Sequence, residues 1–113
     1  MEQSLAAIAN THALLAAASH DGPIWSSSGE QLNVNLIRLS GGAGIEAHIN
    51  AELDVTIVVV QGDGLVTIDR AERRVQAGDI VVIPRGVQRV IASAGGVFAY
   101  VTCHRRRAPL MPS

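Results

Sequence analysis

A histidine, an asparagine and an aspartate lie close together in one short stretch of the sequence, EAHINAELD, at residues 46–54. His48 precedes Asn50 by two residues and Asp54 by six. Imidazole nitrogens and carboxylate oxygens bind divalent transition metals, and an imidazole can also act as a general base. An amide oxygen such as that of Asn50 is a poorer metal ligand. The stretch is therefore a candidate metal site, a candidate catalytic site or a polar binding site.

Arg89, Tyr100 and His104 lie further along the chain and are candidates for the same site. An arginine side chain is always charged, offers only hydrogen-bond donors and binds carboxylates through two parallel bonds. His104 ends the apolar run VFAYVTCH at residues 97–104. On an extended strand it shares a face with Tyr100, while Cys103 points to the opposite face. If that face is interior, His104 reaches the same space as His48.

Short strands separated by turn residues must position these groups. Residues 4–18 predict a helix with Ser4 as its N-cap, and Asp21-Gly22-Pro23 ends the helical pattern. The runs that predict strands are LNVNLIRL (32–39), DVTIVVV (54–60), LVTIDR (65–70), RRVQ (73–76), IVVIP (80–84), VQRVIA (87–92) and VFAYVTCH (97–104). About eight short strands with no linker between them predict an all-β sandwich or barrel, preceded by one short helix.

Local patterns make these predictions more specific. The run at 54–60 is continuously apolar, which is typical of a strand buried on both sides. QGDG at 61–64 predicts a hairpin turn, and a second turn is expected near Ala71-Glu72. Gly62, Gly64 and Gly78 are expected to adopt the positive φ angles of tight turns.

The composition of the 113 residues fits one globular domain built on aliphatic side chains. Hydrophobic residues make up 48%, charged residues 17% and aromatic residues only 3%. The formal net charge is −1 and the only basic run is Arg105–Arg107, so neither nucleic acid nor a membrane is an expected partner. Cys103 is the only cysteine and no basic segment opens the chain, so we expect a cytoplasmic protein without a disulfide.

Two sets of residues together form a longer pattern. The first runs through Gly42, His48, Asn50, Asp54 and Gly62, and the second runs through Gly78, Pro84, Gly86 and Arg89 within GDIVVIPRGVQR. This pattern resembles the two-motif signature of the small bacterial-type cupins, which are single-domain β-barrels of the jelly-roll type. The resemblance implies a barrel over residues 23–104, an N-terminal helix and lead-in over 1–22, and a tail over 105–113.

The resemblance also implies a site, and this sequence departs from it. In the family, two histidines and a glutamate of the first motif and a histidine of the second bind one divalent metal inside the barrel. The corresponding residues here are His48, Asn50, Asp54 and Arg89, and Ser93 takes the place of the asparagine that closes the second motif. A guanidinium cannot bind a cation and repels one at close range. The resemblance therefore implies a degenerate site without a firmly bound metal, in which we expect Asp54 and Arg89 to form an ion pair.

Four functions stay open at this point. The leading hypothesis is a barrel that binds a small polar or anionic metabolite in a central pocket lined by His48, Asn50, Asp54, Arg89, Tyr100 and His104. The second is an enzyme of the isomerase, lyase or dioxygenase type with His48 as base. The third is weak binding of Fe, Mn, Ni or Zn by His48, Asp54 and His104, and the fourth is a structural or regulatory module with a vestigial pocket. Family habit and the apolar tail APLMP also predict a homodimer in which a strand, the tail or the N-terminal helix crosses to the partner.

Overall fold

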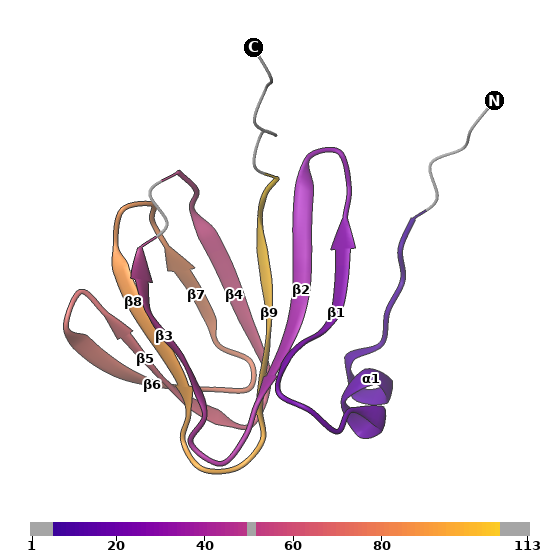
Figure 1. Ribbon diagram of the computed structural model, residues 1–113, viewed down its shortest axis with the longest axis horizontal. Coiled ribbons are helices and arrows are strands. Elements are labelled where there is room, and N and C mark those ends of the chain that lie inside the picture. Colours follow the sequence, from indigo (N-terminus) through magenta and orange to yellow (C-terminus); the bar gives the residue numbers. More distant parts are fainter. Residues whose placement is uncertain (1–5, 50–51, 107–113) are drawn as a thin grey trace.

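Alternation of apolar and polar residues gives most of the strands one face that can be buried. The computed structural model describes residues 6–49 and 52–106, without the side chains of residues 45–49. This part of the chain forms one helix and nine strands (Figure 1): α1 (Thr11–Ala17), β1 (Gly22–Ser28), β2 (Leu32–Leu39), β3 (Gly44–Ile49), β4 (Val55–Gln61), β5 (Asp63–Ile68), β6 (Ala71–Gln76), β7 (Ile80–Ile83), β8 (Gln88–Ser93) and β9 (Phe98–Arg105).

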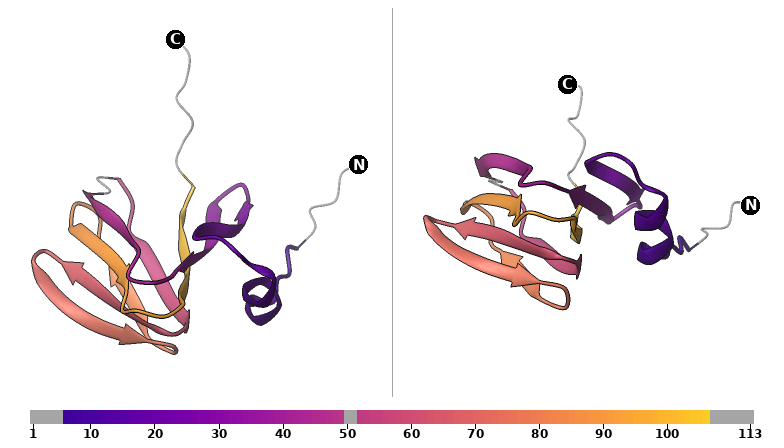
Figure 2. Two further views of the ribbon diagram at one scale, coloured as in Figure 1. Left: turned by 60° about the horizontal axis from the view of Figure 1, so that its bottom comes forward. Right: turned by 90° about the horizontal axis from the view of Figure 1, so that it is seen from below.

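The nine strands form two antiparallel sheets. One has five strands in the order β1-β2-β9-β4-β7, and the other has four in the order β3-β8-β5-β6. The sheets face each other, and α1 lies beside β1 at one side of the molecule (Figures 1 and 2). The predicted fold, an all-β jelly-roll barrel with one short N-terminal helix, is confirmed. No helix in the described part of the chain is long and apolar enough to span a membrane.

Aliphatic side chains from both sheets form the core between them. Alternate residues of β4 point into it, namely Val55, Ile57 and Val59. The rings of Phe98 and Tyr100 also lie there, with their centroids 5.3 Å apart. The predicted strand at 54–60 is thus correct. It is not buried on both sides within one chain, because Val58 points away from the core and is 36% exposed.

The connection after β4 differs from the predicted hairpin. Gln61 ends β4 in the five-stranded sheet and Asp63 begins β5 in the four-stranded sheet, so QGDG carries the chain from one sheet to the other. Gly62 has a φ of +74°, as expected, but Gly64 is not among the described residues with positive φ. Gly64 is needed for space instead, since a Cβ there would overlap the ring of Phe98.

Two further boundaries differ from the sequence prediction. The helix starts at Thr11, and its N-cap is Asn10, whose side chain accepts a hydrogen bond of 3.0 Å from the backbone NH of Ala13. Ser4 lies outside the described residues. The hairpin between β5 and β6 turns at Asp69 and Arg70, two residues before the predicted position. Both have positive φ, +49° and +73°, as a two-residue type I′ turn requires.

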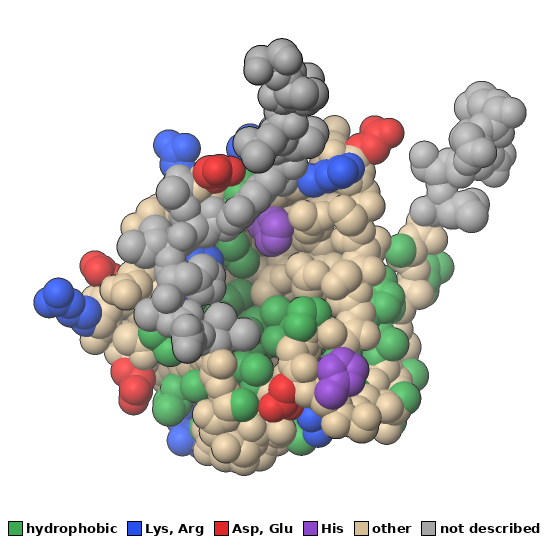
Figure 3. Space-filling model, in the orientation of Figure 1, with side chains coloured by type: hydrophobic (Ala, Val, Ile, Leu, Met, Phe, Trp, Pro, Cys, Tyr) green, Lys and Arg blue, Asp and Glu red, His purple; other side chains and the backbone are tan. Residues whose placement is uncertain are grey.

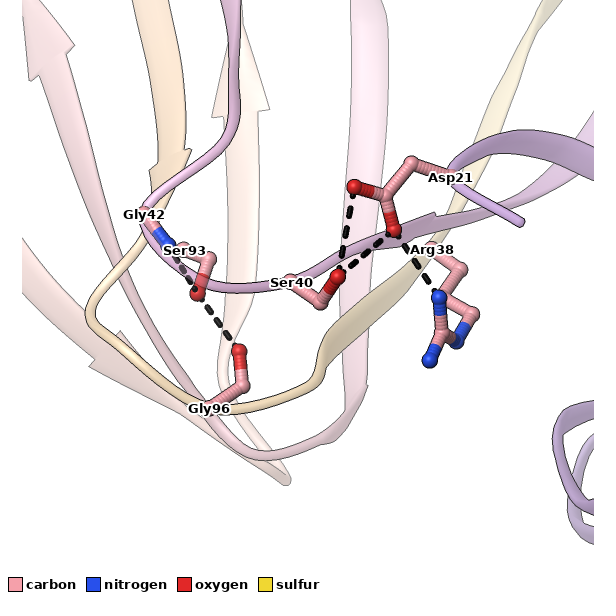
Figure 4. Close-up of polar contacts among 6 residues, drawn as sticks. All are labelled: Asp21, Arg38, Ser40, Gly42, Ser93 and Gly96. Atoms are coloured by element: carbon pink, nitrogen blue, oxygen red, sulfur yellow. Dashed lines mark hydrogen bonds and ion pairs between the residues drawn. The ribbon is translucent and has the colours of Figure 1, made fainter. Parts of the chain in front are cut away.

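Ser93 joins two loops at the closed end of the barrel (Figure 4). Its side chain is buried, and the hydroxyl donates a hydrogen bond of 2.6 Å to the carbonyl of Gly96. The same oxygen accepts from the backbone NH of Gly95 at 3.0 Å and of Gly42 at 3.5 Å. The residue that takes the place of the motif's closing asparagine therefore holds the loop before β3 against the loop after β8.

Loss of the Ser93 hydroxyl should destabilise the fold. Ser93→Ala removes the three hydrogen bonds of a buried hydroxyl, which costs about 1–3 kcal/mol in the free energy of unfolding, measurable by urea denaturation. Ser28→Ala is the matched control, because its hydroxyl bonds Asn33 at an exposed site, and a change within about 0.5 kcal/mol is expected there. Equal losses in the two variants would contradict this role of Ser93.

Candidate functional site

Arg89 is a charged side chain buried between the two sheets. In β8, alternation directs Arg89, Ile91 and Ser93 inward, and Arg89 is only 4% exposed. Its Nη2 donates one long hydrogen bond of 3.4 Å to the carbonyl of Val87. Its Nε is buried and makes no hydrogen bond with the residues that the structure describes. Burial lowers the pKa of the Arg89 guanidinium, but an arginine remains charged in proteins.

The backbone of His48 lies next to that of Arg89. The two residues are directly paired in the register between β3 and β8, which is irregular between Ile45 and His48. Paired residues in antiparallel strands have Cα atoms about 4.5–5.5 Å apart. The fold therefore brings together position 48 of the first motif and position 89 of the second. The side chain of His48 and the whole of Asn50 lie outside the described residues.

Asp54 is not the ion-pair partner of Arg89, and that prediction is wrong. Asp54 is exposed, and its Oδ1 accepts a hydrogen bond of 2.8 Å from the backbone NH of Arg85. Between described residues, the ion pairs are those of Asp21 with Arg38 and of Asp63 with Arg74. The reason is alternation: Asp54 immediately precedes Val55, which is buried, so the chain directs Asp54 away from the interior.

Asp54 and His104 instead line a pocket of about 610 Å³ at the end of the five-stranded sheet where β4 begins and β9 ends. His104 is half-buried, and its Nδ1 lies 2.9 Å from the carbonyl oxygen of Arg105. The described lining also contains Leu32, Glu52, Leu53, Thr56, Arg85, Cys103 and Arg105, and it does not include Arg89. Two of the predicted site residues thus share a rim pocket, and a third lies deeper between the sheets.

Tyr100 belongs to the core. It is 1% exposed and packs against Phe98, so it supports the interior wall and does not present its ring to solvent. Burial raises the pKa of the Tyr100 phenol above its usual value.

A row of neutral polar side chains crosses β1, β2 and β9 on the inward face and was missed from the sequence. Ser26 donates to the Asn35 Oδ1 at 2.6 Å, and the Asn35 Nδ2 donates to the Thr102 Oγ1 at 3.3 Å. In the next row, Asn33 accepts from Ser28 at 2.6 Å and is paired in register with His104. The signal was present in LNVNLIRL, because two asparagines at alternate positions share the face on which Leu39 is buried.

A comparison with protein-family models matches residues 35–102 to the cupin domain. The chain belongs to the cupin family. The matched segment covers more than half of the chain and runs from β2 to β9, so it contains both motifs and Arg89. No protein of curated function matches the sequence.

Solved structures resemble this cupin in fold. The cupin domain of Cnp3 from Schizosaccharomyces pombe is 16% identical to this chain, with a TM-score of 0.67. The match covers 74% of this chain and 63% of that one, so this chain spans less than two thirds of the length of the Cnp3 domain. KdgF from Halomonas sp. is 21% identical, with a TM-score of 0.67 over 73% of this chain and 74% of its own. A cupin-2 domain containing protein from Shewanella frigidimarina is 19% identical, with a TM-score of 0.72. The match covers 88% of this chain and 95% of that protein.

The divalent metal that the family implies does not fit the described residues. Arg89 puts a buried positive charge at one of the four ligand positions, and Asp54 turns outward at another. The described residues contain no group of three histidine, cysteine, aspartate or glutamate side chains that could hold a metal ion. On the inward face, the described residues of this cupin offer a cation and neutral hydrogen-bonding groups, and such a set favours an anion.

Replacing Arg89 by an apolar side chain should leave this cupin equally stable or more stable. Arg89 has no ion-pair partner among the described residues, and a buried charge of this kind costs free energy. Arg89→Met is therefore expected to change the free energy of unfolding by between zero and about +4 kcal/mol. In a double-mutant cycle with Asp54→Asn, urea denaturation should give a coupling energy under about 0.5 kcal/mol. A large loss in Arg89→Met that Asp54→Asn partly restores would reinstate the ion pair.

The raised pKa of Tyr100 predicts a loss of stability at alkaline pH. The phenol ionises near pH 10 in the unfolded chain and at higher pH in the folded chain, so its contribution to stability is present below about pH 10 and declines above it. Tyr100 is the only tyrosine, so the absorbance of tyrosinate reports this one group. The chain has no lysine, so no lysine side chain titrates in the same pH range. Tyrosinate should form only as the protein unfolds, and its formation near pH 10 in folded protein would contradict this view.

Proposed function

We propose that this cupin binds a small anionic metabolite between its two sheets, with Arg89 as the anchor. The observation that supports the proposal is a guanidinium only 4% exposed, with an Nε that has no hydrogen-bond partner among the described residues. A buried charge that lacks a partner destabilises a fold, and charged groups of this kind cluster at functional sites. A carboxylate fits a guanidinium through two parallel hydrogen bonds.

The polar row on the facing sheet supports a ligand that also carries hydroxyl or carbonyl groups. Asn35 and Thr102 lie on the inward face of β2 and β9, and both can donate and accept hydrogen bonds. A pocket with one charged anchor and several neutral groups orients a small polar molecule. On the side of the molecule in Figure 3, hydrophobic side chains gather toward the lower middle, and most charged side chains lie toward the outer rim.

We place this activity in the cytoplasm, since the only cysteine, Cys103, is free.

A second candidate function is catalysis at the same place. The register that pairs His48 with Arg89 favours it, because a base beside a fixed cation suits proton transfer next to a carbonyl group. His48 would take the proton, and Arg89 would stabilise the negative charge that develops on the oxygen. Such chemistry belongs to isomerases and lyases, and the same anion-binding step precedes it.

Arg89 variants test the binding proposal. Thermal shift and calorimetry with acetate, malonate and inorganic phosphate, and with glycerol as a neutral comparison, should show stabilisation of the wild type by at least one anion. An anion present at about 100 times its dissociation constant stabilises the fold by about 2.7 kcal/mol. Arg89→Met should abolish this effect, and Arg89→Lys should weaken it, because lysine keeps the charge and loses the planar pair of donors.

Arg73→Met is the matched control, since Arg73 is exposed on β6, and it should bind as the wild type does. Equal anion binding by Arg89→Met and the wild type would refute the proposal. Zn²⁺, Mn²⁺, Ni²⁺ and Fe²⁺ should each leave the melting temperature unchanged. A rise of several degrees that His48→Ala abolishes would establish a metal site instead.

A further inference from the structure

A pocket of about 440 Å³ lies at one seam between the two sheets. β7 ends the strand order of the five-stranded sheet, and β6 ends that of the four-stranded sheet. The lining comes from β5, β6 and β7 and from Asp79 just before β7, so the pocket lies between these two edge strands. We call it the β6–β7 pocket. Its volume is in the range of pockets that bind small molecules.

The inward side of the β6–β7 pocket is apolar. Four of its side chains belong to the core cluster or pack against it: Val66, Ile68, Val75 and Val81. Ala71, which is paired in register with Ile68, completes this side. None of these side chains can form a hydrogen bond, so a polar ligand group would lose its bonds to water here without replacing them.

The charged residues of the lining either have partners or lie in solvent. Arg74 forms an ion pair of 3.0 Å with Asp63. The Oδ2 atom of Asp79 accepts a hydrogen bond of 2.8 Å from the backbone NH of Gln76. Arg73 is exposed, and an exposed arginine keeps its guanidinium in water. The pocket therefore favours an apolar ligand group.

The β6–β7 pocket adjoins the position of Arg89. On the inward face of the four-stranded sheet, Arg89 of β8 is paired in register with Ile68 of β5. Residues paired in this way have Cβ atoms about 4.5–5.5 Å apart. Arg89 does not itself line the pocket, but Ile68 does. A ligand held by Arg89 therefore needs to pass only one side chain to enter the pocket.

Arg89 also lies between two parts of the interior that differ in polarity. The hydrogen-bonded row of Ser26, Asn35 and Thr102 lies on β1, β2 and β9, toward the end of the five-stranded sheet that is opposite to β7. The β6–β7 pocket lies at the β7 end. A ligand anchored at Arg89 can therefore direct polar groups toward the row and apolar groups toward the pocket.

The spacing of the strands sets the length of the apolar group. Neighbouring strands are about 4.8 Å apart, so β5 and β6 lie about 5 Å and about 10 Å from β8. An extended chain advances about 3.5 Å for every three bonds. The ligand therefore needs about four to eight bonds between its carboxylate and the end of its apolar group.

We infer that the anion bound at Arg89 is a carboxylate with an apolar chain or ring, and that this apolar part occupies the β6–β7 pocket. The inference rests on the proposed anion binding and names the chemical class of its ligand. A ligand that is polar along its whole length, such as a sugar phosphate, would leave the pocket unused.

A series of straight-chain carboxylates tests the inference by calorimetry: acetate, butyrate, hexanoate and octanoate. Burial of one CH₂ group contributes about 0.8 kcal/mol, which is about a fourfold change in the dissociation constant. Hexanoate should therefore bind at least about tenfold more tightly than acetate. 1-Hexanol has a similar chain and no carboxylate, and it should bind at least about tenfold more weakly than hexanoate.

Two leucine variants locate the apolar part of the ligand. Ala71→Leu puts a larger side chain into the pocket, so it should weaken hexanoate binding at least about tenfold and leave acetate binding unchanged. Thr67→Leu is the matched control, because Thr67 precedes Ile68 and points to the outer face of the same sheet. It should bind hexanoate as the wild type does. Circular dichroism should show that both variants fold.

The results distinguish failure of this inference from failure of the proposed function. Equal affinity for acetate and hexanoate, equal affinity for hexanoate and 1-hexanol, or hexanoate binding that Ala71→Leu does not weaken would overturn the inference. Binding of phosphate but of no carboxylate would also overturn it. In each of these cases, anion binding that Arg89→Met abolishes would uphold the proposed function. Absence of all anion binding, or equal anion binding by Arg89→Met and the wild type, would overturn both.

Discussion

Burial of one aliphatic face of each sheet against the other is the constraint on which this structure depends. The chain contains one tryptophan, one phenylalanine and one tyrosine, so small branched side chains must fill most of the interior. Close packing then requires the sheets to approach closely, and Gly64 allows the ring of Phe98 to lie against the backbone of β5. The loops at the closed end are joined by Ser93, which fixes the spacing of the strands that enter and leave the core.

Arg89 is the exception within this interior. Every other inward residue of β8 either packs in the core or satisfies its own hydrogen bonds, while Arg89 has a charge and an Nε that the described residues leave unsatisfied. The family's metal would supply positive charge at this place, and the guanidinium supplies it here as a permanent part of the chain. In the proposed function, the guanidinium of Arg89 meets an anion directly, through two parallel hydrogen bonds, without a bound metal between them.

The five-stranded sheet connects the interior with the surface. Its inward face carries the polar row that includes Asn35 and Thr102, and its outward face carries the exposed side chains of Val58, Ile80 and Val82. β4 and β9 form a wall of the interior and part of the lining of the rim pocket.

The sequence by itself determined the family and seven of the nine strands in the described part of the chain, and it did not predict β1 or β3. Strand formation follows from local alternation and β-branched residues, and the glycine and proline positions of the two motifs are set by backbone sterics, so both can be read locally. Five of the runs predicted as strands match observed strands to within one residue at each end. The runs predicted at 65–70 and 73–76 begin two residues after the observed starts of β5 and β6. The single-domain barrel with a short helix also follows from this local information.

Only the tertiary structure decided which groups meet. QGDG crosses between the sheets where Val97 and Phe98 leave no room for a Cβ atom at Gly62 or Gly64. Asp54 turns outward because its neighbour Val55 must enter the core, and this leaves Arg89 without the carboxylate that its motif position suggested. Sheet membership, register and the direction of a residue at the end of a strand depend on contacts between distant segments. Spacing along the chain therefore identified candidate residues. Packing placed Arg89 between the sheets, Asp54 and His104 in the rim pocket and Tyr100 in the core.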